Sequence, residues 1–335
     1  MSGMRRTHGW STVVMIAFGC GDASSDDTSG ASTMSASTTL GESSATTDSA
    51  TGADTDATSL DSSASDPSDP SDPTDPSGPE DTGDITGDPS TDPTTPAQVE
   101  LPPVDGGLDY QLGGAYEPPA GVLIVSRDRN EAPARGLYNI CYVNGYQAQP
   151  DENDFWLDEH PDLVLRDNNG DPVIDPDWDE MLLDTSTEEK RIALAAIVGD
   201  WIVGCGAAGY QAVEIDNLDT YSRSDGLLTQ DNNVGFMALL SAAAHDAGMA
   251  IAQKNSTEIL DRAAEMGTDF AVAEECSTYD ECGDYVGTYG DAVLMIEYQQ
   301  GDFDAGCADY PGHSIVLRDL YLTMPGDGEY LYDAC

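Results

Sequence analysis

From residue 101 onward, short apolar runs alternate with longer amphipathic stretches. The runs are rich in Val, Ile, Leu and Ala, as strands buried on both faces of a parallel sheet are. Stretches 188–203 and 233–247 have helical spacing, and the second ends before Gly248, a common helix stop. The seven runs expected to form strands are Val122–Val125, Tyr138–Val143, Met181–Leu183, Ala212–Ile215, Ala250–Ala252, Phe270–Ala273 and Val293–Ile296.

Strand–helix alternation over this length predicts parallel βα units. An eighth run, Ser314–Leu317, brings the strands to the number in a (β/α)8 barrel, a TIM-like α/β fold of about 250 residues. A doubly wound open sheet is the alternative fold, but nothing in the sequence resembles its glycine-rich phosphate loop. We therefore expect residues 101–335 to form one barrel domain.

The first twenty residues have the pattern of an export signal. Arg5, Arg6 and His8 precede a short apolar run that ends near Cys20. The run is too short to cross a bilayer, which takes about 20 residues. The small residue before Cys20 resembles the end of a bacterial lipobox. We predict a signal peptide over 1–20 and lipidation of the Cys20 thiol, with plain secretion as the alternative.

Residues 21–100 consist mostly of Ser, Thr, Asp, Ala, Gly and Pro. They include 18 acidic residues, no Lys or Arg, and almost no large apolar side chains. Such a segment buries too little apolar surface to offset the entropy of ordering. We predict a disordered acidic linker, stiffened by proline, that holds the barrel domain away from an outer surface.

The whole chain has a formal net charge of −51, and residues 101–335 contribute 45 acidic against 10 basic residues. This surface repels nucleic acid and anionic membranes, because phosphate binding needs clusters of Lys and Arg. It would attract a cationic substrate, although a solvated surface that keeps the protein soluble is the simpler explanation. We expect no nucleic-acid partner and membrane contact only through the lipid anchor; the sequence leaves the oligomeric state open.

Six cysteines follow Cys20, and an even number in an exported chain suggests disulfides. Cys276 and Cys282 are close enough in sequence to close a short loop. Cys307 with Cys335 would tie down the C-terminus. Six cysteines allow 15 connectivities, and the sequence does not choose among them. No histidine stands at ligand spacing from these cysteines, so we expect neither a metal nor another cofactor.

Polar residues follow four of the apolar runs. Because the active site of a barrel lies at the C-terminal ends of its strands, these residues are candidates for chemistry. Each alone is explained by chance or by helix capping, but their shared position is harder to dismiss. Alternation places Glu214 and Asp216 on one face of their strand. It also allows only one of the adjacent residues Glu274 and Glu275 to face the mouth of the barrel. The candidates are Glu214, Asp216, Lys254, Asn255, Glu274, Glu275 and Glu297.

Two carboxylates across one cleft are what glycoside hydrolysis requires: one donates a proton to the leaving oxygen, and the other stays ionised. Neighbouring carboxylates would help to raise the pKa of the acid. The sequence contains no Gly-x-Ser-x-Gly nucleophile elbow. We therefore predict a metal-independent glycosidase that uses Asp216 and one of the two adjacent glutamates, Glu274 or Glu275.

Several stretches occur in the order found in one known family. Gly209–Asp219 has the pattern Gly-aromatic-x-x-Val-Glu-x-Asp-Asn-x-Asp, and Lys254-Asn255 forms a Lys-Asn pair. The segment Phe270–Cys276 contains Glu274 and ends in a cysteine, and a second cysteine, Cys282, follows it. With the earlier segments Asp109–Leu112 and Tyr138–Gly145, these stretches resemble glycoside hydrolase family 114, the endo-α-1,4-polygalactosaminidases, whose catalytic domain is a (β/α)8 barrel.

The resemblance implies that Asp216 and Glu274 are the catalytic pair of a retaining enzyme, with Asp216 as nucleophile and Glu274 as general acid/base. It implies an extracellular, α-linked amino-sugar polysaccharide of the polygalactosamine kind as substrate. It also implies that Cys276 and Cys282 pin the loop that carries Glu274. The residues it suggests for substrate positioning are Gln111, Tyr142, Glu214, Asn217, Asp219, Lys254, Asn255 and Glu297.

The sequence departs from the family at Gln147–Asp151, which lacks the usual Trp and Arg, and at Ala273 and Glu275, where Asn and Gln are common. These changes leave both catalytic carboxylates in place but affect the expected substrate subsites. Two other functions stay open: a non-catalytic carbohydrate-binding surface lipoprotein with a degenerate glycosidase barrel, and a structural adhesin on an extended stalk.

Overall fold

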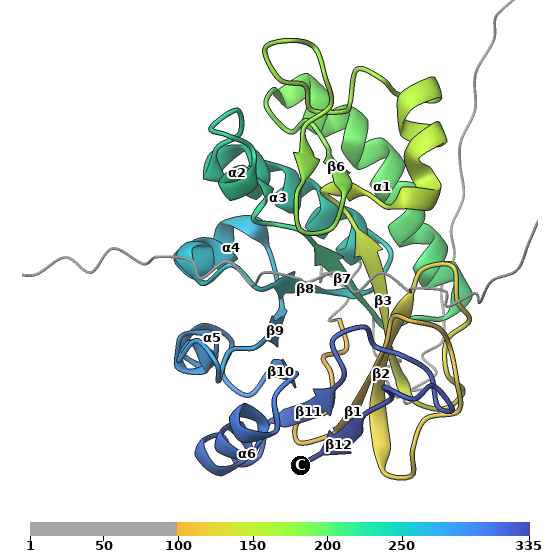
Figure 1. Cartoon of the computed structure of the whole chain (residues 1–335), viewed down its shortest axis with the longest axis vertical. Helices are drawn as coiled ribbons and strands as arrows, with labels where there is room; N and C mark the ends of the chain where they lie inside the picture. The colour runs from red at the N-terminus through yellow and green to blue at the C-terminus, as the bar shows by residue number, and fades with distance from the viewer. Residues whose placement is uncertain (1–98) are drawn as a thin grey trace, which may run out of the picture. The chain divides into compact units, whose positions relative to one another are not determined.

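The computed structural model describes residues 99–335. The predicted signal peptide, Cys20 and all but the last two residues of the predicted linker lie outside the described residues. Within the described part, eight parallel strands stand side by side in one sheet, and an antiparallel strand extends it (Figure 1). The parallel strands are β1 (Gly107–Gln111), β2 (Val122–Asp128), β3 (Tyr138–Asn144), β7 (Ala212–Asp216), β8 (Ala250–Lys254), β9 (Phe270–Glu274), β10 (Val293–Glu297) and β11 (Ser314–Arg318), and the antiparallel strand is β12 (Tyr332–Ala334).

The sheet curls into a nearly closed barrel. β1 and β11 are the first and last parallel strands of the row, and they come together although the described residues form no β-ladder between them. The buried Arg318 guanidinium, at the end of β11, donates a hydrogen bond to the Tyr110 carbonyl oxygen of β1. The predicted TIM-like (β/α)8 class is confirmed.

One predicted barrel strand is wrong. The run Met181–Leu183 overlaps β6 (Glu180–Leu182), the central strand of a small antiparallel sheet with β4 (Gln147–Ala148) and β5 (Ile174–Asp175). This small sheet is inserted between β3 and the helix that follows it. The missing barrel strand is β1, which the apolar pattern overlooks because its Gly-Leu-Asp-Tyr-Gln sequence contains no continuous apolar run.

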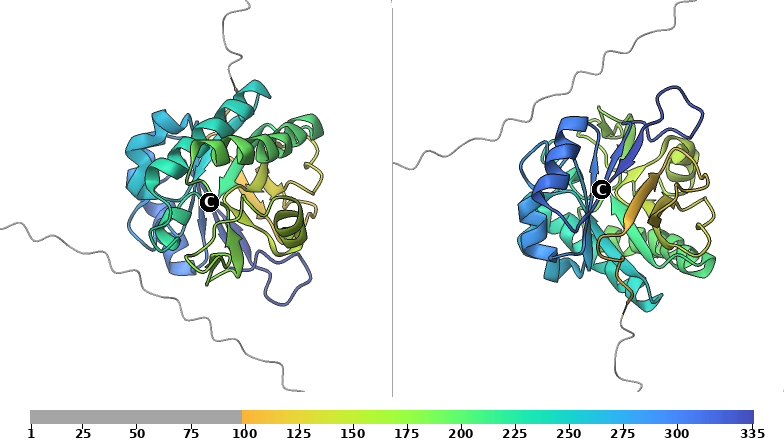
Figure 2. Two further views of the ribbon diagram at one scale, coloured as in Figure 1. Left: turned by 90° about the horizontal axis from the view of Figure 1, so that it is seen from above. Right: turned by 90° about the horizontal axis from the view of Figure 1, so that it is seen from below.

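The helices lie along the outside of the strands from β3 round to β11, as two further views also show (Figures 1 and 2). No helix follows β1 or β2 in the described chain; loops connect them to the next strand. Short helical turns occur at 150–152, 155–159 and 257–262. The α-helices are α1 (Glu188–Ala208), α2 (Thr220–Arg223), α3 (Gln230–Asp246), α4 (Ala263–Met266), α5 (Cys282–Tyr289) and α6 (Gln300–Asp309).

Helix α1 shows how local sequence sets the bounds of an element. Thr187 caps its start by accepting a hydrogen bond from the Lys190 backbone, and Gly209 ends it with φ 103°, which glycine adopts without strain. By length and composition α1 is apolar enough to cross a membrane. In the barrel its buried face, which includes Leu194 and Val198, packs in the core shared with α3 and the outer faces of the strands.

Three disulfides tie the elements together. Both pairs suggested by the sequence are present, and the remaining two cysteines join the third barrel strand to α1. The pairs are Cys141–Cys205, Cys276–Cys282 and Cys307–Cys335.

Alternation along the strands sorts the apolar side chains into two cores. One set fills the barrel, and the other packs beneath the helices. On β9, for example, Phe270 and Val272 belong to the inner core, while Ala271 and Ala273 pack against α5 and α6. At the C-terminal ends of several strands, the inward-facing positions are occupied by polar instead of apolar side chains. These polar side chains form the site described next.

Candidate active site

Three neighbouring strands end in charged side chains that meet above the barrel core. Asp216 ends β7, Lys254 ends β8 and Glu274 ends β9. Each continues the inward-facing set of its strand, so all three converge on the mouth. The lysine side chain is only 2% exposed, whereas those of Asp216 and Glu274 are 21% and 23% exposed. The carboxylates are therefore open to a ligand, and the cation lies beneath them.

Lys254 joins the two carboxylates. Its Nζ lies 3.3 Å from Asp216 Oδ1 and 3.1 Å from Glu274 Oε2. These two oxygens therefore cannot be farther apart than the two distances together, which lies within the range of carboxyl separations found in glycosidases. Asp216 and Glu274 thus flank a space small enough for one glycosidic bond.

Asp216 is held as an anion. Its Oδ2 accepts a hydrogen bond from the Tyr142 hydroxyl at 2.8 Å, and its Oδ1 accepts one from the Asn217 backbone at 2.9 Å. Burial alone would raise the pKa of Asp216, but the Lys254 charge and these donors outweigh burial and lower it below its usual value. Asp216 is therefore ionised at neutral pH.

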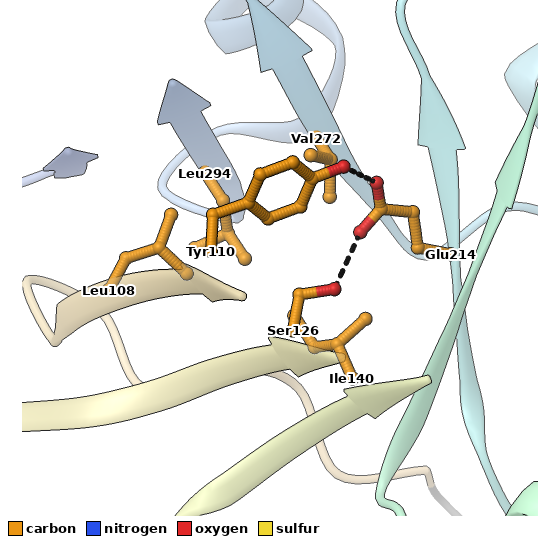
Figure 3. Close-up of a pocket in the computed structure, with 7 residues that line it drawn as sticks. All are labelled: Leu108, Tyr110, Ser126, Ile140, Glu214, Val272 and Leu294. Carbon is orange, nitrogen blue, oxygen red and sulfur yellow. Dashed lines mark hydrogen bonds between the residues drawn. The ribbon is translucent and has the colours of Figure 1, made fainter. Parts of the chain in front are cut away.

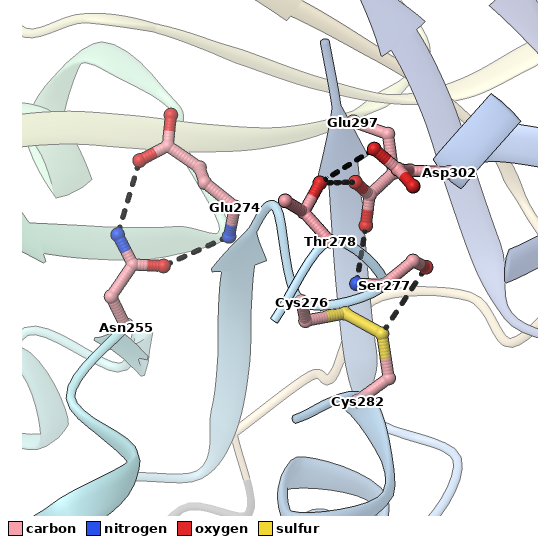
Figure 4. Close-up of a disulfide and its surroundings, with 8 residues drawn as sticks. All are labelled: Asn255, Glu274, Cys276, Ser277, Thr278, Cys282, Glu297 and Asp302. Atoms are coloured by element: carbon pink, nitrogen blue, oxygen red, sulfur yellow. Dashed lines mark hydrogen bonds between the residues drawn. A yellow bond between two sulfur atoms is a disulfide. The ribbon is translucent and has the colours of Figure 1, made fainter. Parts of the chain in front are cut away.

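Glu274 is held at both ends by Asn255, as Figure 4 shows. Asn255 Oδ1 accepts a hydrogen bond from the Glu274 backbone at 2.8 Å, and its Nδ2 donates to Glu274 Oε2 at 3.1 Å. The Tyr298 hydroxyl donates to Oε1. Asn255 itself has φ 48°, a left-handed conformation that asparagine tolerates better than most residues. Of the two adjacent glutamates it is Glu274 that joins the cluster, while Glu275 lies beyond the end of β9.

The sequence model of glycoside-hydrolase family GH114 matches residues 89–335. The chain belongs to glycoside-hydrolase family GH114. It is therefore a glycoside hydrolase, and the resemblance stated from the sequence is confirmed. No curated protein sequence matches the chain.

Comparison with solved structures finds similar chains. The structure of Aspergillus fumigatus Ega3 in complex with galactosamine is 22% identical, covers 71% of this chain and 98% of that chain, and has a TM-score of 0.57. The glycoside hydrolase domain of PelA from Pseudomonas aeruginosa is 14% identical, with 66% and 97% of the two chains covered and a TM-score of 0.43. At this identity the Ega3 likeness shows the shared barrel fold.

In this GH114 enzyme the predicted residue Glu214 lies inside the barrel, below the mouth. Its Oε1 accepts a hydrogen bond from the Tyr110 hydroxyl at 2.5 Å, and its Oε2 accepts one from Ser126 Oγ at 3.0 Å (Figure 3). Lys254 Nζ lies 3.2 Å from Oε1. Burial raises the pKa of Glu214, and the Lys254 charge opposes this rise. Since the Glu214 side chain is 0% exposed, it supports Lys254 from below.

Lys254 stays charged despite its burial. Burial lowers the pKa of Lys254, but the carboxylates of Asp216 and Glu274 outweigh burial and raise it well above its usual value. Lys254 also lies near the faces of Tyr110 and Tyr142, at 5.6 Å and 5.8 Å from the ring centroids.

Glu297 of the GH114 barrel belongs to the outward-facing set of β10 and secures the loop after Glu274. It is fully buried, and its Oε1 accepts a hydrogen bond from the Ser277 backbone at 2.8 Å (Figure 4). The Cys276–Cys282 disulfide closes the same loop. Both cysteines lie close enough to Glu297 for a shared metal ion, but their sulfurs are bonded to each other. Glu297 and the disulfide together position the segment that follows the catalytic strand.

Asn217 and Asp219 lie at the rim, where Arg223 connects them. Arg223 donates to Asp219 Oδ2 at 2.7 Å and to Asn217 Oδ1 at 3.1 Å. Asn217 also donates to Asn144 Oδ1 at 2.9 Å. This network orders the loop that begins directly after Asp216.

Gln111 lies apart from Asp216 and Glu274. It faces the opposite side of β1 from Tyr110, in a buried network in which it donates to Asp109 at 2.6 Å and accepts from Arg127 at 2.9 Å. This position fits support of β1 more directly than contact with a ligand.

The strand-end search assigned no role to Tyr298, although this aromatic ends its run, and it overlooked Tyr110 and Glu180. Tyr298 follows the inward-facing Ile296 at a spacing of two, so alternation places it on the same side as the barrel core. Tyr110 was hidden because β1 was not recognised as a strand. Glu180 lies on the inserted small sheet, and no periodicity of the barrel strands points to it.

Proposed function

We propose that the protein hydrolyses an α-linked amino-sugar polysaccharide of the polygalactosamine kind outside the cell, with Asp216 and Glu274 as its catalytic pair. The observation that carries this proposal is the shared contact of both carboxylates with Lys254, while each keeps about a fifth of its side chain exposed at the barrel mouth. Membership of GH114 supports the reaction class.

We expect retention of configuration, as the family resemblance implies, and the contact of one oxygen of each carboxylate with Lys254 keeps the pair close together. Ionised Asp216 attacks the anomeric carbon, while Glu274 gives its proton to the leaving glycosidic oxygen. Glu274 then takes a proton from water, which attacks the glycosyl–Asp216 ester and restores both groups. Tyr142 and Lys254 orient Asp216, and Asn255 and Tyr298 orient Glu274.

An amino-sugar polymer suits the charge of the domain. Unacetylated amino sugars carry ammonium groups, and residues 101–335 carry a large excess of acidic residues. Such a field draws cationic chains toward an acidic cleft. The similar structure of Ega3 was obtained with galactosamine, which supports the same sugar class for this chain.

The three disulfides support export, because such bonds persist in oxidising compartments. Lipidation of Cys20 remains a prediction from the sequence. Replacing Cys20 with Ala should release the protein from membranes into the soluble fraction. If the variant stays with the membrane, the anchor lies elsewhere.

The test of the proposed function is incubation of the purified protein with α-1,4-linked galactosamine polymer. We expect new reducing ends, a fall in polymer length, and α-anomers as the first products seen by proton NMR. β-anomers would contradict retention. Binding of the oligosaccharide without any reducing ends over long incubation would instead select the non-catalytic carbohydrate-binding alternative.

A further inference from the structure

The small sheet inserted after β3 brings a further carboxyl group, that of Glu180, near the proposed catalytic pair. Asn144, the last residue of β3, stands opposite Asp216 in the parallel register with β7. Its Nδ2 donates a hydrogen bond to Glu180 Oε2 at 2.8 Å. In Figure 1, β6, which Glu180 begins, lies beside the ends of β3 and β7. Glu180 is therefore one side chain removed from Asp216.

The orientation of Asn144 is fixed by its other contacts. Its Oδ1 accepts hydrogen bonds from Asn217 Nδ2 at 2.9 Å and from the Gln147 backbone at 3.1 Å. The amide nitrogen of Asn144 must then point at Glu180. One carboxylate oxygen of Glu180 is held in this way, and among residues 99–335 no donor is found for the other, Oε1.

Glu180 differs from the carboxylates around it. Asp175 lies 2.7 Å from Arg223, Asp219 is paired with the same arginine, and Glu152 is paired with Arg129. Across the described residues no Lys, Arg or His forms an ion pair with Glu180. A half-buried carboxylate without a cation is unfavourable in the free protein, because burial disfavours the charged form. A cationic ligand would supply the missing partner.

We propose that Glu180 determines specificity by binding the ammonium group of a substrate sugar next to Asp216. This inference rests on the proposed function and adds the group that distinguishes free amino sugars from their N-acetylated forms. An ammonium group donates to Oε1 and neutralises the carboxylate. An acetamido group is uncharged and larger, so Glu180 adds little to the affinity for an N-acetylated sugar.

The test compares the binding of two ligands in a catalytically silenced protein. The full chain with Glu274→Gln is titrated by calorimetry with an α-1,4-galactosamine oligomer and with its fully N-acetylated counterpart. Adding Glu180→Gln keeps an acceptor for Asn144 but removes the charge. We expect the Kd for the galactosamine oligomer to rise about tenfold or more, the usual effect of losing a charged hydrogen bond, and the Kd for the acetylated oligomer to stay within about twofold.

Asp179→Asn in the same background is the matched control. Asp179 is exposed, belongs to the same hairpin and has φ 57°, which asparagine accepts, so the variant removes a nearby charge without touching Asn144. It should leave both Kd values within about twofold. Equal weakening of both oligomers by Glu180→Gln, or no change in either, would overturn the inference. Failure of the proposed function would appear separately, as wild-type protein that releases no reducing ends.

Discussion

Asn255 holds Glu274 through two hydrogen bonds, one to its backbone nitrogen and one to its carboxylate. Glu274 ends β9 and Asn255 directly follows the neighbouring strand β8, so the position of the proposed acid/base is set by a side chain just beyond the end of β8. The asparagine was expected from the sequence to contact substrate, and in the structure its amide is committed to Glu274.

This relationship predicts the effect of removing the amide. Asn255→Gly should lower kcat about 100-fold with little change in KM, because a misplaced acid/base loses catalysis and not substrate affinity. Glycine accepts the positive φ of this position, so the variant separates loss of the amide from backbone strain. Steady-state kinetics with a thermal unfolding scan would check it; kcat near that of the wild type would show that Asn255 does not position Glu274.

The charge of Lys254 predicts a shift in the pH profile. Since this charge lowers the pKa of Asp216 against the effect of burial, Lys254→Met should raise that pKa. Asp216 must be ionised to attack, so the acidic limb of the kcat/KM profile should move to higher pH and activity at neutral pH should fall. Lys254→Arg keeps the charge and should move the limb less. An unchanged acidic limb in Lys254→Met would count against this role.

Glu180 predicts how stability depends on pH. Burial, opposed by the Asn144 hydrogen bond and reinforced by the charge of Asp216, raises the pKa of Glu180 to about 7; Asp175 and Glu152 act in the same direction. The folded state therefore binds this proton more tightly than the unfolded state, and its contribution to stability is lost as pH rises through about 7. Urea unfolding between about pH 5 and about pH 8 should show this loss in the wild type and in Asp179→Asn, and a smaller loss in Glu180→Gln. If the free energy of unfolding depended on pH in the same way in all three proteins, the pKa of Glu180 would not be raised in the folded state.

The disulfides should separate stability from activity. Cys141–Cys205 spans 64 residues, and replacing both cysteines with Ser should cost about 4 kcal/mol of stability. Cys276–Cys282 spans only 6 residues, and its removal should cost about 2 kcal/mol. The short disulfide begins two residues after Glu274, so its loss should lower kcat more than loss of the long one does. Denaturant unfolding and kinetics on both variants would check this. A lower kcat in the variant without Cys141–Cys205 than in the variant without Cys276–Cys282 would contradict a role for the short disulfide in holding Glu274.

The barrel and its charged strand ends could be predicted because they rest on local rules. Apolar runs marked seven of the barrel strands. Alternation allowed only one of Glu274 and Glu275 to face the mouth, the family resemblance favoured Glu274, and Glu274 is the one that ends β9 and joins the cluster. What escaped prediction depends on tertiary contacts. β1 is stabilised by its place beside β2 and by Arg318 from the far end of the chain, not by its own apolar residues. Glu180 comes near Asp216, through its hydrogen bond with Asn144, only because an inserted hairpin folds over the end of β3.

The measurement that tests the central claim most directly is reducing-end release from α-1,4-galactosamine polymer by Asp216→Asn and Glu274→Gln, beside the neighbouring variant Glu275→Gln. We predict that each of the first two loses about 1,000-fold or more of the wild-type rate while unfolding at nearly the same temperature, as expected when a nucleophile or an acid/base is removed. Glu275→Gln should stay within about threefold of the wild type. Activity within about tenfold of the wild type in either Asp216→Asn or Glu274→Gln would contradict the assignment of the catalytic pair.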